Sequence, residues 1–375
     1  EGLDGTELAI SESQERMAVV VSAENADRFI AAAEKENLSA TPVAVVTDKN
    51  RLVMHWNGRT IVDLSRDFLN SNGAAKHISV EVAAPALRQP EQETGSASER
   101  WMQRVGSLNV ASQKGLVQRF DSTISGGTVL LPFGGRTQGS ETQVSVQKLP
   151  VEGYTETASI MAYGYNPFLT SWSPYHGAAY AVVEACAKVV AAGAEFGGMR
   201  FSYQEYFERM HTARSWGKPL AALLGALRMQ VELGLPSIGG KDSMSGTFQQ
   251  INVPPMLMAF GITTVDARRV ISTDLKEAGH TLYLLKHTPK ANRMPDTAAL
   301  RTLWNYASER IAAGRIVAGY AVGFGGVAEA LAKMAFGNGI GAEVELPEEA
   351  LFAYDYGSIV VESTVELDAP FAVRL

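Results

Sequence analysis

Residues 235–246 read Leu-Pro-Ser-Ile-Gly-Gly-Lys-Asp-Ser-Met-Ser-Gly, and no other stretch says as much about the fold of this chain. A short apolar segment runs into two glycines, which let a backbone come close to a neighbour or a ligand. Lys241 then offers a positive charge for phosphate, Asp242 a carboxylate for Mg²⁺ or an amine, and Ser243 a neutral donor. The same residues also suit a polar turn after a strand. Taken alone, the stretch leaves both interpretations open.

The composition is that of a globular protein with two or three domains. The chain has 375 residues, of which 46% are hydrophobic and 19% charged. A net charge of −7 without a basic cluster argues against nucleic acid as a partner. No apolar run approaches the roughly 18–20 residues that span a bilayer, so no membrane association is expected. The single cysteine, Cys186, fits a reducing cytoplasm and lies in an apolar helical pattern, so we expect a buried, inert thiol.

Hydrophobic periodicity predicts alternating strands and helices, which places the chain in the α/β class. The expected helices are 26–36, 177–192, 216–233 and 328–335, and the expected strands are 16–21, 43–47, 52–56, 60–63, 128–131, 158–163 and 281–285. Asn57-Gly58 predicts a tight hairpin between two short strands, and Gly193 predicts the end of a long helix.

An ordered set of motifs resembles phosphoribosylformylglycinamidine synthase, the amidotransferase of purine biosynthesis. Gly-Gly-Lys-Asp-Ser-Met-Ser at 239–245 is similar to the signature of its second synthetase half. The other motifs that fit this half, in the family's order, are Asn-Val-Ala-Ser-Gln-Lys-Gly-Leu at 109–116, Arg-Phe-Asp-Ser-Thr-Ile at 119–124, Ser-Pro-Tyr-His-Gly-Ala at 173–178, Gln-Glu-Tyr-Phe at 204–207 and Trp-Gly-Lys-Pro-Leu at 216–220. Together they cover nearly the whole chain, which resembles a fragment of the large single-chain type without its glutaminase domain.

The resemblance implies a fold like that of aminoimidazole ribonucleotide synthetase. Residues 101–266 would form an N-terminal-type α/β domain that pairs with its duplicate into a barrel, and 267–375 a truncated C-terminal-type α/β sandwich domain. Residues 1–86 would be the end of the equivalent domain of the first half, and the polar residues 87–100 a linker. The similar runs 13–21 and 354–362 would mark equivalent positions in the two repeated domains. A chain with one barrel partner is expected to expose an apolar sheet face and to form a homodimer.

The resemblance implies an ATP- and glutamine-dependent ligase that converts formylglycinamide ribonucleotide to formylglycinamidine ribonucleotide. ATP activates an amide oxygen and glutamine-derived ammonia displaces phosphate, which requires a phosphate cradle, Mg²⁺ and a shielded ammonia path. Gly239 and Gly240 would present N–H groups to phosphate, and Lys241, Asp242 and Ser243 would complete the substrate site. The partners in the full enzyme would be the first synthetase half and the glutaminase domain.

A second set of residues corresponds, by resemblance, to an auxiliary nucleotide site that has lost its metal ligands. Glu184 and Lys188 lie four apart on one helix face, and Lys188 stands where relatives have a metal-binding Asn. Ala321 and Gly323 replace an Asp and a Ser of the superfamily motif, and a methyl group cannot hold Mg²⁺. We expect a Glu184–Lys188 ion pair and neither ATP nor Mg²⁺ on this chain. The alternatives are a surface ion pair and a retained metal.

Three further residues are candidates for a pocket. The resemblance implies this role for His176, Gln204 and Glu205, with a structural histidine and a simple helix start as the alternatives. No residue of this chain is predicted to be catalytic, and the isolated fragment is expected to be inactive. A non-catalytic structural scaffold remains the main alternative function. An independent kinase-like enzyme of the same superfamily is a third, which the missing carboxylates near Ala321 argue against.

Overall fold

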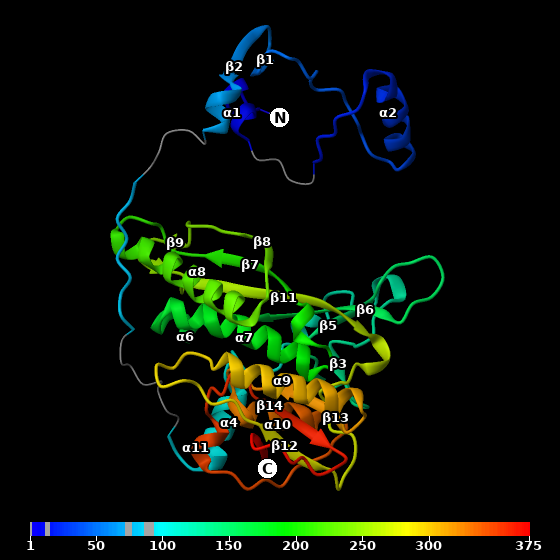
Figure 1. The fold of residues 1–375 in the computed structure, drawn as a ribbon, viewed down its shortest axis with the longest axis vertical. Helices are drawn as coiled ribbons and strands as arrows, with labels where there is room; N and C mark the ends of the chain where they lie inside the picture. Colours follow the sequence, from blue (N-terminus) through cyan, green and yellow to red (C-terminus); the bar gives the residue numbers. More distant parts are fainter. Residues whose placement is uncertain (1, 12–15, 72–76, 86–93) are drawn as a thin grey trace. The chain divides into compact units, whose positions relative to one another are not determined.

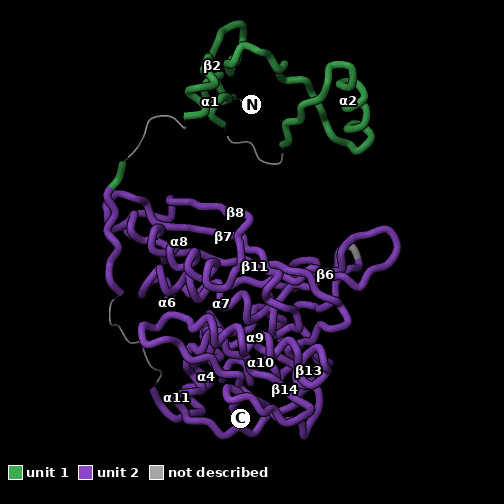
Figure 2. The backbone as a smooth tube through the Cα atoms, in the orientation of Figure 1, with its two compact units in different colours: residues 1–78 green, residues 79–375 purple. Residues whose placement is uncertain are grey.

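The computed structural model describes residues 2–11, 16–71, 77–85 and 94–375. The chain divides into two compact units, 1–78 and 79–375 (Figure 2). Half of the predicted linker 87–100, residues 87–93, lies outside the described residues, and 97–100 belong to the helix α4 (Ala97–Gly106). The four-part division expected from the resemblance stays a prediction.

The first unit is built on the predicted hairpin. The strands β1 (Arg51–Trp56) and β2 (Arg59–Ser65) pair antiparallel, and Asn57 and Gly58 between them have φ values of 47° and 75°. Positive φ at both positions is the condition for a type I′ turn, so this prediction is confirmed. The other elements of the unit are α1 (Gly5–Ile10), η1 (Ala23–Asn25), α2 (Ala26–Lys35) and α3 (Arg66–Asn70).

Two other strands predicted in this unit are wrong. Residues 16–21 and 43–47 are not in strands, and in the described part of the unit only β1 and β2 pair. Their apolar side chains are open to solvent, with Val20 81% and Val45 86% exposed. A β-branched run becomes a strand only when a neighbour takes its N–H and C=O groups, and here no described segment does so.

The second unit contains a five-stranded sheet with the order β5-β6-β11-β7-β8. Its strands are β5 (Ser145–Lys148), β6 (Thr157–Gly164), β7 (Arg200–Tyr206), β8 (Ser237–Lys241) and β11 (Met256–Asp266). Only β7 and β8 are parallel. The helices α6 (Pro167–Trp172), α7 (Pro174–Ala191) and α8 (Ala213–Leu233) run along this sheet (Figure 1). The strand predicted at 158–163 and the helices predicted at 177–192 and 216–233 are confirmed.

The opposite face of this sheet exposes an apolar patch, as predicted. Met161 and Tyr163 on β6 are 41% and 51% exposed, and Ile262 on β11 is 40% exposed. Their partners across the two strands are Met161 with Ile262 and Tyr163 with Phe260. The four side chains therefore form one continuous patch.

A second, antiparallel sheet has the order β13-β14-β12-β15. Its strands are β12 (Thr281–Leu285), β13 (Ile316–Ala321), β14 (Ile359–Ser363) and β15 (Ala372–Arg374), and its helices are α9 (Thr297–Ala312), α10 (Gly326–Phe336) and α11 (Glu348–Leu351). The predicted strand 281–285 and helix 328–335 are confirmed. The short elements are α5 (Lys114–Val117), η2 (Ile124–Gly126), β3 (Phe133–Gly134), β4 (Ser140–Glu141), η3 (Phe196–Gly198), β9 (Thr247–Phe248), β10 (Ile251–Asn252) and η4 (Ala267–Arg269). The prediction of a strand at 128–131 is wrong, because the structure has a single β-bridge there, between Thr128 and Gln147.

The helix α7 is where the two sheets meet. It contacts β6 and β11 on one side and β13, β14 and α9 on the other, and its residues from Gly177 to Ala191 are buried. Ser173 caps its first turn and Pro174 follows at the first helical position, where a missing N–H costs nothing. Cys186 is fully buried on this helix, and burial raises the pKa of its thiol. The fold is thus mixed α/β, with a charged pair of α7 in its centre. In the described residues, no helix combines the length and apolar character needed to cross a membrane.

Candidate functional site

The strand β8 carries the glycine pair at an edge of the five-stranded sheet. A Cβ atom on Gly240 would lie 2.5 Å from the carbonyl oxygen of Tyr203 on β7, so only glycine allows the two strands to approach this closely. A Cβ atom on Gly239 would meet nothing within 4 Å. Gly240 therefore has a packing role, while the backbone at Gly239 borders open space.

The polar loop after β8 is held against the end of β7. The N–H of Ser243 donates to the carbonyl oxygen of Glu205 at 3.1 Å, and the N–H of Phe207 donates to the carbonyl oxygen of Ser243 at 2.9 Å. Lys241 and Asp242 are exposed, and the hydroxyl of Ser243 bonds to the hydroxyl of Ser245, at 3.0 Å. The loop is thus anchored by its backbone and presents its functional groups outward.

Glu205 is a buried carboxyl beside this loop. Only 7% of the residue is exposed, and its Oε1 has no hydrogen-bond partner among the described residues. Burial, together with the nearby charge of Asp242, raises the pKa of Glu205 to about 7. Such a carboxyl can donate or accept a proton near neutral pH, a property that is common at functional sites. Gln204 follows the alternation of β7 to the other face of the sheet, and the strand excludes the helix start considered as an alternative.

His176 lies in the first turn of α7, and both nitrogens of its ring are bonded to other groups of the protein. Its Nδ1 bonds to Oγ of Ser173 at 2.8 Å, and its Nε2 bonds to the carbonyl oxygen of Asn292 at 3.1 Å. Burial lowers the pKa of the imidazole. This geometry favours the structural interpretation of His176 over a ligand-facing one.

The residues of the expected auxiliary site meet between α7 and the loop after β13. Nζ of Lys188 lies 2.8 Å from Oε1 of Glu184, and both side chains are at least nine-tenths buried. The backbone N–H and C=O of Ala321 are both bonded to the side chain of Gln143, at 2.7 and 3.0 Å. A Cβ atom on Gly323 would lie 3.9 Å from Oε1 of Glu184. The ion pair is therefore an internal one rather than a surface pair.

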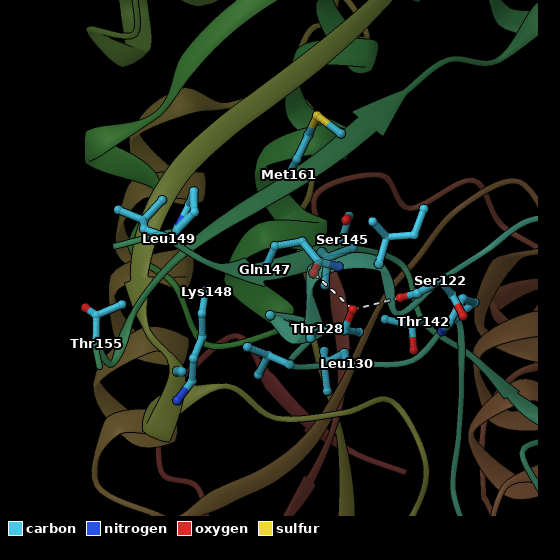
Figure 3. A pocket seen from close by; sticks show the side chains of 18 of the residues that line it. Ser122, Thr128, Leu130, Thr142, Ser145, Gln147, Lys148, Leu149, Thr155 and Met161 are labelled. Carbon is cyan, nitrogen blue, oxygen red and sulfur yellow. Dashed lines mark hydrogen bonds between the residues drawn. The ribbon is translucent and has the colours of Figure 1, made fainter. Parts of the chain in front are cut away.

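A wide cavity of about 1130 Å³ opens beside β5 and β6, where sequence reasoning placed no site. Figure 3 shows Thr128 in its wall, where its hydroxyl bonds to Ser122 at 2.7 Å and to Gln147 at 3.0 Å. Four residues of the 119–124 motif line it, namely Phe120, Asp121, Ser122 and Ile124. The 119–124 motif was therefore the sequence feature that could have pointed to this cavity, but none of its residue types indicates a cavity. The ammonium of Lys148 in the wall is already paired with Glu156 at 3.1 Å.

Carboxylate and imidazole groups do not gather into a metal site in the part of the chain described. No group of three or more His, Cys, Asp and Glu residues there could hold an ion. Any metal chemistry at the loop after β8 would therefore need ligands from elsewhere.

Comparison with known proteins gives a consistent picture. Residues 1–57 and 271–366 match the family described as "AIR synthase related protein, C-terminal domain". The chain is 25% identical to "Phosphoribosylformylglycinamidine synthase subunit PurL" of Thermoplasma acidophilum over 404 aligned residues, covering 98% of this chain and 51% of the relative. The corresponding subunit of Rhodococcus opacus is 26% identical, with 96% and 50% covered. This chain thus spans about half the length of the curated relatives it matches.

Solved structures agree on the fold. "T. maritima PurL complexed with FGAR" superposes with a TM-score of 0.70 at 19% identity, covering 99% of this chain and 54% of that one. "T. maritima PurL complexed with ATP" gives 0.67 at 19% identity, with 100% and 56% covered. At such identities the likeness concerns the fold alone.

Proposed function

We propose that this chain takes part in the ligase reaction of purine biosynthesis. It resembles PurL subunits of phosphoribosylformylglycinamidine synthase along nearly its whole length. The reaction is the ATP- and glutamine-dependent conversion of formylglycinamide ribonucleotide to formylglycinamidine ribonucleotide. Because the chain spans half of its relatives, it would supply one synthetase half, and the other half would supply the catalytic ATP site.

The anchored loop after β8 carries this proposal. Lys241 would face the substrate phosphate, the hydroxyl of Ser243 would bind the substrate, and N–H groups at Gly239 would approach an anion. Glu205 would hold a proton near these groups. A protein of the same fold has been solved as "T. maritima PurL complexed with FGAR", which supports a substrate of this class.

ATP and Mg²⁺ would be cofactors of the assembled enzyme. Bound Mg²⁺ would neutralise phosphate charge, and Asp242 is the exposed carboxylate of this loop that could contribute one oxygen to it. The remaining ligands, the first synthetase half and a glutaminase domain that releases ammonia would be its partners. A cytoplasmic location goes with this proposal.

A scaffold role is the second candidate, favoured by the open patch of Met161, Tyr163, Phe260 and Ile262. Apolar side chains on an uncovered sheet face suit pairing with a second sheet, which would be the barrel with the other half or a homodimer of this chain. In that role, the chain would brace the catalytic half and the ammonia route.

Two substitutions separate these candidates when introduced into the assembled enzyme. Ser243→Ala and Asp242→Ala should each lower the synthetase rate at least about 10-fold, because they remove groups expected at the transition state. Ser237→Ala, at the exposed start of the strand β8 that precedes this loop, is the matched control and should leave the rate unchanged. Unchanged turnover in the first two variants, with weakened assembly, would support the scaffold role instead.

A further inference from the structure

Two buried glutamate–lysine pairs converge on Gly323 from different helices. On α7, Nζ of Lys188 lies 2.8 Å from Oε1 of Glu184, and on α10, Nζ of Lys333 lies 2.8 Å from Oε1 of Glu329. In each pair the lysine follows the glutamate by four residues, one helical turn. A Cβ atom on Gly323 would lie 3.9 Å from both Oε1 of Glu184 and Oε2 of Glu329. The two carboxylates thus face the same small space beside the backbone of residue 323.

The pair on α10 includes a third carboxylate. Oε2 of Glu141 lies 2.6 Å from Nζ of Lys333, although the two residues are 192 positions apart in the chain. Burial alone would lower the pKa of Lys333, but the charges of Glu329 and Glu141 outweigh it and raise the pKa. The ammonium therefore stays charged, and two lysines face three carboxylates in this cluster.

Each carboxylate oxygen at the centre is already bonded to a donor of the protein. Oε2 of Glu184 accepts from the N–H of Tyr165 at 3.0 Å, and Oε2 of Glu329 accepts from the N–H of Gly325 at 2.7 Å. The hydroxyl of Tyr320 donates to Oε1 of Glu329 at 3.1 Å. Mg²⁺ needs several oxygens at about 2.0–2.1 Å, so an ion here would have to displace donors that these four oxygens already bind.

We propose that the ammonium groups of Lys188 and Lys333 take the place of divalent cations here, so that the expected auxiliary nucleotide site is filled by side chains of the protein itself. The site then takes neither metal nor nucleotide and needs neither for stability. The reason is charge compensation. A buried carboxylate without a cation is strongly destabilising, and each lysine supplies that cation at hydrogen-bonding distance.

The proposal predicts that removing a lysine creates a demand for a metal. Lys188→Met and Lys333→Met keep the length of the side chain and delete its charge. Each variant should lose thermal stability, and millimolar MgCl₂ should restore at least about 3 °C of Tm, because an ion that binds only the folded state stabilises it. Lys218→Met is the matched control, because Lys218 pairs with the single carboxylate of Glu208 at 2.7 Å near the surface. Its Tm should not respond to MgCl₂.

Two measurements keep the test decisive if a single variant does not fold. The double variant Glu184→Gln/Lys188→Met removes both members of the one-to-one pair on α7, so it leaves no carboxylate without its lysine and should fold and ignore MgCl₂. Equilibrium dialysis of the unaltered chain with Mn²⁺, and titration calorimetry with MgCl₂ and ADP, should show no binding at millimolar concentrations. Binding to the unaltered chain, or lysine variants that fold but do not respond to the metal, would overturn the proposal.

Discussion

The backbone nitrogen of Ser243 lies 3.1 Å from the carbonyl oxygen of Glu205, and this hydrogen bond ties the polar loop after β8 to the end of the strand β7. Together with the bond from the N–H of Phe207 to the carbonyl oxygen of Ser243, it holds the hydroxyl of Ser243 and the carboxylate of Asp242 near the buried carboxyl of Glu205.

Stability should fall as the pH rises from about 5 to 8, in part because of Glu205. Its pKa is raised from 4.5 to about 7 in the folded chain, so the folded state binds more protons than the unfolded state between these values. The contribution of Glu205 to the free energy of unfolding is therefore fully present below about pH 4.5 and is lost as the pH rises through 7, a loss of up to about 3 kcal/mol. Urea unfolding at several pH values should show that Glu205→Gln gains stability relative to the unaltered chain as the pH increases. Parallel profiles for the two proteins would contradict this assignment.

Gly240→Ala should weaken the pairing of β8 with β7. The new methyl group would lie 2.5 Å from the carbonyl oxygen of Tyr203, and backbone atoms cannot step aside cheaply. We expect a loss of about 1–3 kcal/mol in the free energy of unfolding, measured by denaturant titration. Gly341→Ala is the control, since a Cβ atom there meets nothing within 4 Å. Equal stability of the two variants would argue against the packing role of Gly240.

The open sheet face should mediate self-association. Light scattering after size exclusion should give the mass of a dimer for the unaltered chain and of a monomer for Met161→Lys/Ile262→Lys, because charges on this patch cannot be buried cheaply. Val231→Lys changes an exposed apolar residue of α8, 73% exposed, and should leave the dimer intact. A strict monomer at high concentration would count against the pairing.

Cys186 should react with a thiol reagent only after unfolding. It is fully buried on α7, and burial raises the pKa of its thiol, which keeps the reactive thiolate rare. As the single cysteine of the chain, it gives an unambiguous signal. Its modification rate should follow the unfolded fraction across a urea series. Rapid modification in buffer would show that α7 opens independently of the rest.

Several elements could be predicted from residues that are close together in the sequence. Asn57-Gly58 predicts its hairpin because both residues tolerate positive φ. The apolar run from 177 predicts most of α7, although the helix begins three residues earlier, at Pro174 after the cap Ser173. The same local logic produces the pair of Glu184 and Lys188, whose spacing places them on one helix face whatever surrounds them. The loop at 241–243 was also recognisable, because its glycines and polar residues are consecutive.

Partners distant in the chain decided the rest. The run 16–21 has the composition of a strand but pairs with no described segment, while the similar residues of β14 lie between β12 and β13. Nothing near Lys333 in the sequence indicates Glu141, 192 residues away. Nothing near Glu205 indicates that burial and the charge of Asp242 would raise its pKa. Hairpins and helix faces are set by bonds within a few residues, whereas strand pairing, buried charge compensation and shifted pKa values depend on groups that only the folded chain brings together.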